Sequence, residues 1–349
     1  MKKQNQKTGS QPEINVKMKS TDLINKCGFC HGANSVPLYK TSDIFGDEFF
    51  LNRCNICRAV FLAPPPTNEQ IRRAYDDSYY GSGEEKFKEG MIEKMLDYFR
   101  RKRAKTVYNF AIKKSIETGH ALPLRFLDIG CGNGKFLSFV KQLGKVEIYG
   151  IEPEGGSANR AEKIPEIHLK KGFLEKNDFE KEYFDAITLF HVFEHLAEPL
   201  KTIEIISEIL KKNGILMMSF PNIDSFQSRL FKGRWLHLDP PRHLFFFSPG
   251  DFKNEMEKAG FEILRERHFS IEYNPFGFQQ SLLNCIFKKR EILYESLKGN
   301  KEYVKEFSKA NLLLQNLFFK LSSPIFILFD VFESLFRKGA TVEFVMRKK

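Results

Sequence analysis

The stretch Arg125-Phe-Leu-Asp-Ile-Gly-Cys-Gly-Asn-Gly134 decides the fold of this chain. Its first half is a short apolar run with the length and composition of a buried strand. Glycine then occupies every second position, so the backbone can turn sharply and a ligand can approach the main chain. Apolar residues with helical spacing follow from Phe136 to Val140. The stretch therefore predicts a strand, a ligand-binding turn and a helix, the unit of an α/β fold.

Two kinds of nucleotide-binding turn compete for this stretch. The dinucleotide fingerprint has the spacing G-x-G-x-x-G, whereas this chain has G-x-G-x-G with Asp128 two positions before Gly130. An acid at that place sits poorly beside a pyrophosphate, but it suits a positively charged ligand. The motif Asp128-Ile-Gly-Cys-Gly-Asn-Gly134 resembles the first motif of the class I S-adenosylmethionine-dependent methyltransferases.

A second acid lies at the distance at which folds of this kind bind a ribose. The segment 146–152 predicts the next strand, and Glu152 ends it, 22 positions after Gly130. An acid at this place can accept hydrogen bonds from both ribose hydroxyls. The ordinary alternative is an acid that caps the following helix. In register with the glycine turn, Glu152 is interpreted as a ribose ligand.

The resemblance implies an α/β fold with a Rossmann-like, seven-stranded and mostly parallel sheet, whose last strand is antiparallel. It also implies S-adenosyl-L-methionine as the methyl donor. The family typically lines the adenine pocket with residues just after the third strand. The residues expected to bind the donor are Asp128, Gly130, Cys131, Gly132, Gly134, Glu152, Phe173, Leu174 and Phe190.

Two pairs of cysteines predict a metal site near the N-terminus. Cys27 and Cys30 form one C-x-x-C motif, and Cys54 and Cys57 form another. Two such motifs can supply the four thiolates of a tetrahedral Zn²⁺ site. An iron–sulfur cluster or a redox pair is the alternative. A closed site with four thiolates has no open position for catalysis, so we expect the zinc to be structural.

Three histidines are candidate general bases. The segment His191-Val-Phe-Glu-His195 matches the H-x-x-E-H motif of inverted zinc peptidases. That motif requires a well-formed helix, whereas His191 follows a predicted strand and Pro199 comes soon after. We therefore expect this segment at the carboxyl edge of the sheet, beside the donor. His191, His195 and His243 are the candidate catalytic bases, and a purely structural role is the alternative for each.

An apolar insertion separates the last two predicted strands. The runs 312–319 and 325–336 are apolar, and Pro324 between them predicts a helical hairpin. Lysine and arginine residues flank both runs, so the insertion is expected to be a lid, a homodimer surface or a membrane-surface element. No stretch of 18 uncharged apolar residues occurs, and we therefore expect no transmembrane helix.

Composition and spacing divide the chain into segments. Residues 1–20 are polar and basic with no apolar run, which predicts a disordered tail and not a signal peptide. Six cysteines without a signal peptide favour the reducing cytoplasm, with the inner face of the membrane as the alternative. The expected segments are a tail over 1–22, a zinc ribbon over 23–66, a helical linker over 67–119, a methyltransferase domain over 120–272 and 338–349, and a helical insertion over 273–337.

The resemblance implies methyl transfer to a small-molecule, sugar, glycan or lipid-linked acceptor, at oxygen or carbon. The four-cysteine module is also similar to that of sugar C-methyltransferases, but we do not expect the further C-terminal domain that those enzymes carry. The alternatives are a nucleic-acid or protein methyltransferase that docks through the ribbon, and a non-catalytic zinc-ribbon binding protein. A nucleic-acid acceptor is not expected, because His191-Val-Phe-Glu194 lacks the Asn/Asp-Pro-Pro-aromatic motif of exocyclic-amine methylases. The net charge of +11 suits a lysine-rich surface or an anionic partner.

Overall fold

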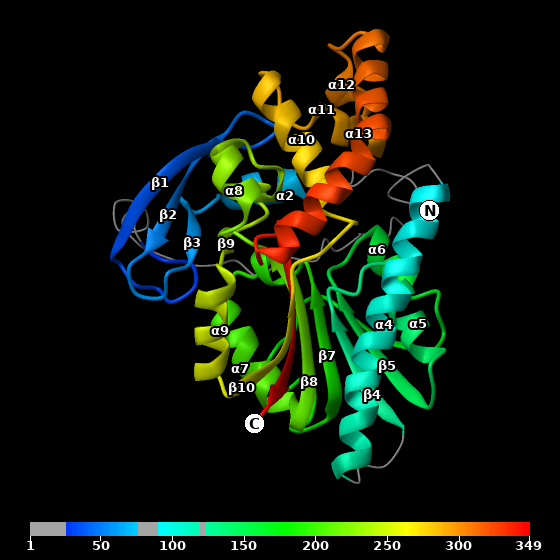
Figure 1. The fold of residues 1–349 in the computed structure, drawn as a ribbon. Helices are drawn as coiled ribbons and strands as arrows, with labels where there is room; N and C mark the ends of the chain where they lie inside the picture. The colour runs from blue at the N-terminus through cyan, green and yellow to red at the C-terminus, as the bar shows by residue number, and fades with distance from the viewer. Residues whose placement is uncertain (1–25, 76–89, 119–122) are drawn as a thin grey trace, which may run out of the picture.

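The larger part of the molecule is a single seven-stranded sheet with helices on both faces (Figure 1). The computed structural model describes residues 26–75, 90–118 and 123–349, so the tail predicted over 1–22 lies outside the described residues. The strands of this sheet are β4 (Leu124–Ile129), β5 (Val146–Glu152), β6 (Ile167–Lys171), β7 (Phe184–Phe190), β8 (Leu210–Pro221), β10 (Phe261–Arg267) and β11 (Thr341–Lys348).

The strand order is β10-β11-β8-β7-β4-β5-β6. β11 runs antiparallel to both of its neighbours, and the remaining pairs are parallel. The chain leaves β4 for β5 on one side and later returns to β7 on the other side. Ligands of open α/β sheets bind at such a switch point, beside the carboxyl ends of the strands. The predicted fold class is confirmed, including the antiparallel last strand.

Alternate residues of the strands face two separate apolar layers. Phe126 and Ile148 face one layer, which contains α4 (Gly90–Thr118) and α5 (Lys135–Lys141). Leu127 and Ile187 face the other layer, which contains α7 (Pro199–Ile209) and α9 (Pro249–Lys258). These strand residues are at most 1% exposed. Burial on both faces explains why the central strands are apolar throughout, and the short α6 (Gly156–Ala161) connects β5 to β6.

The cysteine motifs belong to a second, four-stranded sheet. Its strands are β1 (Ser35–Ser42), β2 (Glu48–Cys54), β3 (Val60–Ala63) and β9 (Phe245–Phe246), in that order. β9 lies far outside the ribbon predicted over 23–66, and it pairs antiparallel with β3. Phe29 packs its ring 4.7 Å from Phe247 and 6.4 Å from Phe193, measured between ring centroids. The ribbon therefore shares an apolar core with the large sheet.

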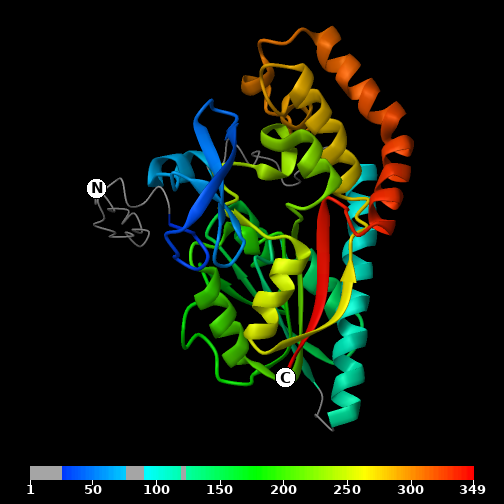
Figure 2. The ribbon, with the colours of Figure 1, turned by 60° about the vertical axis from the view of Figure 1, so that its left-hand side comes forward.

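The remaining helices are gathered above the carboxyl edge of the large sheet (Figures 1 and 2). The predicted helical hairpin is wrong, because one continuous helix of 27 residues contains Pro324. The hydroxyls of Ser322 and Ser323 donate to the carbonyls of Phe318 and Phe319 in the turn around this proline. These helices are α2 (Asn68–Ala74), α8 (Phe226–Phe231), α10 (Asn274–Ile286), α11 (Ile292–Lys298), α12 (Lys301–Val304) and α13 (Lys309–Leu335).

Helix α13 is long and apolar enough to cross a membrane, judged by length and composition alone. The expectation of no transmembrane helix stays a prediction, because length and composition alone do not place a helix in a membrane. Lys320 interrupts the apolar sequence of α13, but a single lysine does not prevent a helix from meeting lipid. Only 6% of the most apolar window of α13 is buried.

Candidate active site

The glycine turn follows β4 directly and has one packed and one open side. Gly130 and Gly132 have φ angles of 73° and 57°, in the left-handed region that favours glycine. A Cβ atom on Gly130 would lie 2.3 Å from Cγ2 of Val192, so a side chain there would displace the segment after β7. A Cβ atom on Gly132 would meet nothing within 4 Å. A ligand can therefore approach the backbone at Gly132.

Two acids border this turn. Asp128 is buried near the end of β4 and accepts a hydrogen bond from Oγ1 of Thr188 at 2.6 Å. Glu152 ends the neighbouring strand β5, and its Oε2 accepts the backbone N–H of Gly132 at 2.9 Å. The predicted donor residues at these positions are thus brought together from two adjacent strands.

Burial shifts the ionisation of these groups. It raises the pKa of Asp128 to about 7, and the charge of Glu152 acts in the same direction. Burial also raises the pKa of Glu152. A positively charged ligand beside these carboxyls would favour their ionised forms. Burial raises the pKa of the Cys131 thiol as well, so this sulfur stays protonated and acts as a packing group.

The predicted adenine residues lie just beyond Glu152. The N–H of Gly172, which follows β6, donates to the carbonyl of Glu152 at 2.9 Å. This bond places Phe173 and Leu174 beside the end of β5. Phe173 is 61% exposed, whereas Leu174 is partly buried against the core. An exposed aromatic ring at this edge is available to cover a ligand.

Phe190 and Gly134 lie on the other side of the turn. Gly134 is the N-cap residue of α5. The ring of Phe190, at the end of β7, meets the ring of Phe136 edge-on at 5.0 Å. The guanidinium of Arg103 from α4 lies 5.2 Å above the Phe190 ring. Phe190 therefore connects the glycine turn to the neighbouring surface of α4.

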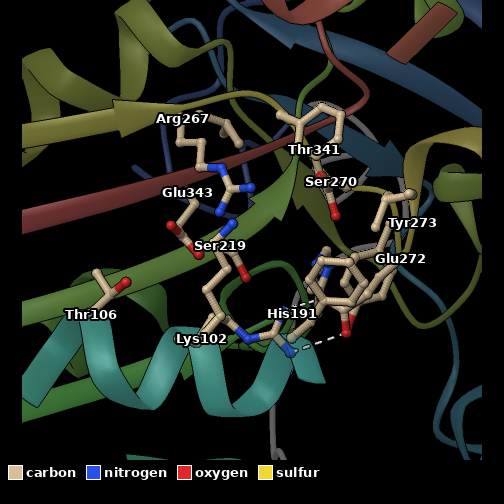
Figure 3. Close-up of a pocket in the computed structure, with 15 residues that line it drawn as sticks. Lys102, Thr106, His191, Ser219, Arg267, Ser270, Glu272, Tyr273, Thr341 and Glu343 are labelled. Atoms are coloured by element: carbon tan, nitrogen blue, oxygen red, sulfur yellow. Dashed lines mark hydrogen bonds and ion pairs between the residues drawn. The ribbon is translucent and has the colours of Figure 1, made fainter. Parts of the chain in front are cut away.

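A pocket lies beside the turn, between α4, the ends of β8 and β10, and the start of α10 (Figure 3). Arg103 and Glu272 form a two-bonded ion pair in its wall. His191, Glu272 and Tyr273 gather on one side, and Arg267 and Glu343 lie on the other (Figure 3). The pocket thus combines both signs of charge, a hydroxyl-bearing ring and an imidazole, which suits a polar acceptor group.

His191 is the predicted base that lines this pocket. It follows β7 with a φ angle of 54°, and its N–H donates to the carbonyl of Ser219 at 2.8 Å. Its ring lies 4.1 Å from the ring of Tyr273. Nδ1 of His191 is 3.4 Å from Oε1 of Glu194. A carboxylate at this position stabilises the imidazolium that forms when the ring takes up a proton.

The other two predicted bases, His195 and His243, are not lining residues of this pocket. Their rings meet at 4.5 Å. Nδ1 of His195 lies 3.0 Å from the carbonyl of Arg242, and Nδ1 of His243 lies 2.8 Å from the carbonyl of His237. Burial lowers the pKa of His195 well below its ordinary value, so this ring is neutral. Nε2 of His243 lies 3.9 Å from Oε1 of Glu194.

Glu194 connects these histidines, and its role was missed in the sequence. It is 1% exposed, and neither carboxylate oxygen has a hydrogen-bond partner among the described residues. Ligand-type atoms of Glu194, His195 and His243 all lie within 4.8 Å of one another. Burial raises the pKa of Glu194 to about 7, against the opposing charge of His243. This carboxyl can therefore hold or release a proton near neutral pH.

Further residues, in the wall of the pocket and outside it, were not singled out in the sequence. His237 approaches α10 so closely that a Cβ atom on Gly277 would lie 2.3 Å from its Nε2. Burial lowers the pKa of His237 to about 3, and the nearby His191 contributes to this shift. The glycine in α10 was the available signal for this close approach. Arg103, Glu272 and Tyr273 had no such signal, since α4 and the start of α10 meet only in the folded chain.

The four ribbon cysteines also come together. Sγ of Cys27 lies 3.6 Å from Sγ of Cys57, and Sγ of Cys30 lies 3.5 Å from Sγ of Cys54. All four sulfurs lie within 4.8 Å of one another. A tetrahedral zinc site with Zn–S bonds of about 2.3 Å has sulfurs about 3.8 Å apart. The donor set and its spacing fit a four-thiolate metal site.

A seven-stranded sheet with one antiparallel strand, and a glycine turn between two acids at its carboxyl edge, define the class I S-adenosylmethionine-dependent methyltransferases, and this chain belongs to that class. A family model described as a methyltransferase domain matches residues 93–266. The matched segment includes the glycine turn, Glu152 and His191. The resemblance seen in the motif Asp128–Gly134 is confirmed, and S-adenosylmethionine is the cofactor of this class.

Curated relatives are similar to this chain over its methyltransferase segment. A ubiquinone biosynthesis O-methyltransferase of Azorhizobium caulinodans is 28% identical over 151 residues, which cover 40% of this chain and 59% of the relative. The protein of the same name from Dinoroseobacter shibae is 29% identical over 175 residues, which cover 46% of this chain and 67% of the relative. Among solved structures, phosphoethanolamine N-methyltransferase 2 of Haemonchus contortus is 14% identical, covers 83% of this chain with 61% of its own, and has a TM-score of 0.46.

Proposed function

We propose that the protein transfers the methyl group of S-adenosylmethionine to a hydroxyl oxygen of a small-molecule, sugar or lipid-linked acceptor. The observation that carries this proposal is the open face of Gly132. The backbone N–H of Gly132 donates to Glu152, and the turn that contains Gly132 begins just after Asp128. The names of the curated relatives support an oxygen acceptor on a small molecule. C-methylation of a similar acceptor is the remaining alternative.

The residues around the turn fit the proposed donor. Gly132 has no Cβ atom, and the space beside its backbone is open. A ligand that lies on the main chain requires this space. Asp128 offers a carboxyl to a positive charge, and Glu152 has a second oxygen for a ribose hydroxyl. Phe173, Leu174 and Phe190 would border the adenine and the turn. When bound, S-adenosylmethionine supplies a methyl group that is already activated by its positive sulfur.

The protein therefore has to position the acceptor and accept its proton. His191 lines the pocket next to the turn and is the proposed base. Glu194, 3.4 Å from its Nδ1, would stabilise the protonated ring. His195 and His243 are proposed as positioning residues, because their ring nitrogens lie within 4.8 Å of the Glu194 carboxylate and neither ring lines the pocket. The ion pair of Arg103 and Glu272 would orient polar groups of the acceptor.

For the four cysteines we propose a structural zinc ion. The sulfur separations support it, and so does the buried position of the site beside Phe29. The ring of Phe29 is covered by the core of the large sheet, so this face of the ribbon is not free to dock a nucleic acid or a protein. The ribbon is thus proposed to stabilise the active-site edge of the sheet.

A labelled-methyl assay tests the proposed acceptor class. The full chain is incubated with methyl-labelled S-adenosylmethionine and, separately, with a soluble catechol, a nucleotide-linked sugar, a bacterial lipid extract, tRNA and a cell protein extract. We expect label in the catechol, the nucleotide-linked sugar or the lipid extract. Chemical cleavage of methyl ethers should then release this label. Label in tRNA or in protein alone would instead support a methyltransferase that docks through its ribbon.

A further inference from the structure

Helix α13 turns its polar residues toward the protein and its apolar residues toward solvent. It is the outermost helix of the insertion, seen in orange and red in Figures 1 and 2. A surface helix normally turns its apolar residues to the core and its polar residues to solvent. In α13 the buried residues are Gln315, Asp330 and Glu333, all of them polar. Each of the three is at most 4% exposed.

The inward face is fixed by hydrogen bonds. Asp330 accepts from Nδ2 of Asn274 at 2.6 Å and from the N–H of Ser270 at 3.1 Å. Glu333 accepts from Nε2 of Gln227 at 3.1 Å. On the other side of Pro324, Nε2 of Gln279 donates to the carbonyl of Phe319 at 2.9 Å and to Oγ of Ser322 at 2.8 Å. Rotation of the helix would break bonds to three different segments, so the orientation of α13 is set by its polar face.

The outward face is apolar over almost its whole length. Soluble monomers rarely expose a contiguous apolar patch of more than a few hundred Å². Ten large apolar residues of α13 are 42–77% exposed, at intervals of three and four that keep them on one side. From first to last they span about 33 Å. They are Leu313, Leu314, Leu317, Leu321, Ile325, Leu328, Phe329, Val331, Phe332 and Leu335.

A neighbouring helix extends this face. Phe226 and Leu230 of α8 are 39% and 64% exposed. The ring of Phe226 is stacked 6.4 Å from the ring of Phe332 of α13. It also lies 6.3 Å from Phe336, just after the helix. The apolar surface is therefore broader than a single helical stripe.

The exposed charges of this face are positive. Lys309 and Lys320 of α13 are exposed, as is Arg337, which follows the helix closely. The two acids of α13 are the buried Asp330 and Glu333. The face thus offers apolar side chains and cations, with no exposed carboxylate on the helix. Apolar residues bordered by Lys and Arg are the composition of a helix that lies in the interface of an anionic membrane.

We propose that the outward face of α13, extended by Phe226 and Leu230, docks onto the surface of an anionic phospholipid bilayer, with the helix lying in the plane of the membrane. The connections at the two ends of α13 exclude a helix that spans the membrane. The end of α13 leads at once into β11 in the large sheet, and its start leads from α12 in the same body. Both ends of the helix therefore remain on one side of the membrane.

A second copy of the chain fits this face less well than lipid does. Lys320 lies near the middle of α13, and Lys309 and Arg337 lie near its two ends, so cations are distributed along the whole face. The same helix presents no exposed acid to meet them. An anionic lipid headgroup meets the charge, and the acyl region accepts the apolar side chains. Docking would also place the pocket close to lipid, because Ser270, held by Asp330, lines it.

Vesicle flotation with the full chain tests this inference without reference to methyl transfer. We expect wild type to float with vesicles of phosphatidylcholine containing phosphatidylglycerol, and to bind vesicles of phosphatidylcholine alone at least fivefold more weakly. The double variant Leu321→Gln/Leu328→Gln should bind the anionic vesicles at least tenfold more weakly. Lys320→Glu should weaken binding at least fivefold.

The matched control removes two equally exposed apolar residues elsewhere. Ile56→Gln/Ile116→Gln changes side chains that are 64% and 76% exposed, and it should float like wild type. The inference would be overturned if all variants floated like wild type, or if wild type did not float at all. A dimer in vesicle-free buffer that Leu321→Gln/Leu328→Gln dissociates, without flotation of wild type, would assign the face to a second copy. None of these results depends on the proposed acceptor.

Discussion

Asp128 couples donor binding to pH in this account. Its pKa in the free protein is raised to about 7 by burial, and a cationic ligand favours the ionised carboxyl. Below pH 7 binding must therefore release a proton, so affinity rises with pH and levels off above pH 7. Calorimetric titration with S-adenosylmethionine should show roughly tenfold tighter binding at pH 7 than at pH 5.5, as the ionised fraction grows.

The variant Asp128→Asn separates this effect from other carboxyls of the site. It should bind S-adenosylmethionine more weakly and with an affinity that no longer rises between pH 5.5 and pH 7. Glu152 also has a raised pKa and borders the same turn. If Asp128→Asn keeps the slope of wild type, Glu152 and not Asp128 is the group that releases the proton.

His191 is expected to act on the acceptor and not on the donor. His191→Ala should lower kcat by about 10²–10⁴-fold, the usual contribution of a general base, and leave the affinity for S-adenosylmethionine within about twofold. His168→Ala, on the outer strand β6, is the control and should retain kcat. A His191→Ala protein with unchanged kcat would transfer the role of base to another group of the pocket.

The sequence indicated the residues of the proposed donor site more readily than those of the proposed acceptor site. Asp128, Gly130 and Gly132 are contiguous, and Glu152 lies at the end of the next strand, so local spacing was sufficient to find them. Glu194 stands in the sequence only as the acid of the segment His191–His195, with no role of its own. Its importance comes from burial without a hydrogen-bond partner, a property that only tertiary packing creates.

At the scale of the element, two glycines of one turn should respond differently to alanine. Gly132→Ala adds a methyl group in open space, so it costs only about 1–2 kcal/mol for the left-handed backbone but should weaken S-adenosylmethionine at least tenfold. Gly130→Ala adds the same backbone cost and a contact of 2.3 Å with Val192, and should destabilise the fold further. Urea unfolding measures the stability of both variants, and calorimetry measures their affinity for S-adenosylmethionine. Equal donor affinity in wild type and Gly132→Ala would place the donor elsewhere.

The ribbon should unfold together with the large sheet, because Phe29 joins their cores. Phe29→Ala is expected to lower the free energy of unfolding by about 3–5 kcal/mol, as for other buried phenylalanines. Phe50→Ala in the same ribbon removes a ring that is 47% exposed and should cost about 1 kcal/mol or less. Separate unfolding of the ribbon in Phe29→Ala, without any change in the unfolding of the large sheet, would contradict a shared core.

Element boundaries were predictable where periodicity was strong and wrong where one residue was given too much weight. The strands followed from apolar runs, and the antiparallel direction of β11 followed from the resemblance to the class I methyltransferases. Pro324 predicted a break that does not occur. Hydrogen bonds on both sides of the proline, from Gln279 and Asn274, hold the helix against the body of the protein. Such tertiary bonds override the local preference of proline.

At the scale of the whole molecule, the sequence could not tell which side of α13 faces outward. Asp330, Glu333 and Gln315 are the residues that a helical wheel would assign to solvent. The partners of the two acids, Asn274 for Asp330 and Gln227 for Glu333, are more than 50 residues away in the chain. The folded structure reverses the expected orientation and leaves the apolar side uncovered. The large sheet then lies on one side of this helix, with its carboxyl edge close to it (Figures 1 and 2).

The proposed function depends on binding of S-adenosylmethionine at the turn between Asp128 and Glu152, which calorimetry of the full chain measures. We predict one site with a Kd on the order of 1–100 μM. Glu152→Ala should weaken binding at least tenfold, because a charged hydrogen-bond acceptor is lost, whereas the exposed Glu154→Ala should bind like wild type. No heat at millimolar ligand, or equal affinity of wild type and Glu152→Ala, would contradict the account.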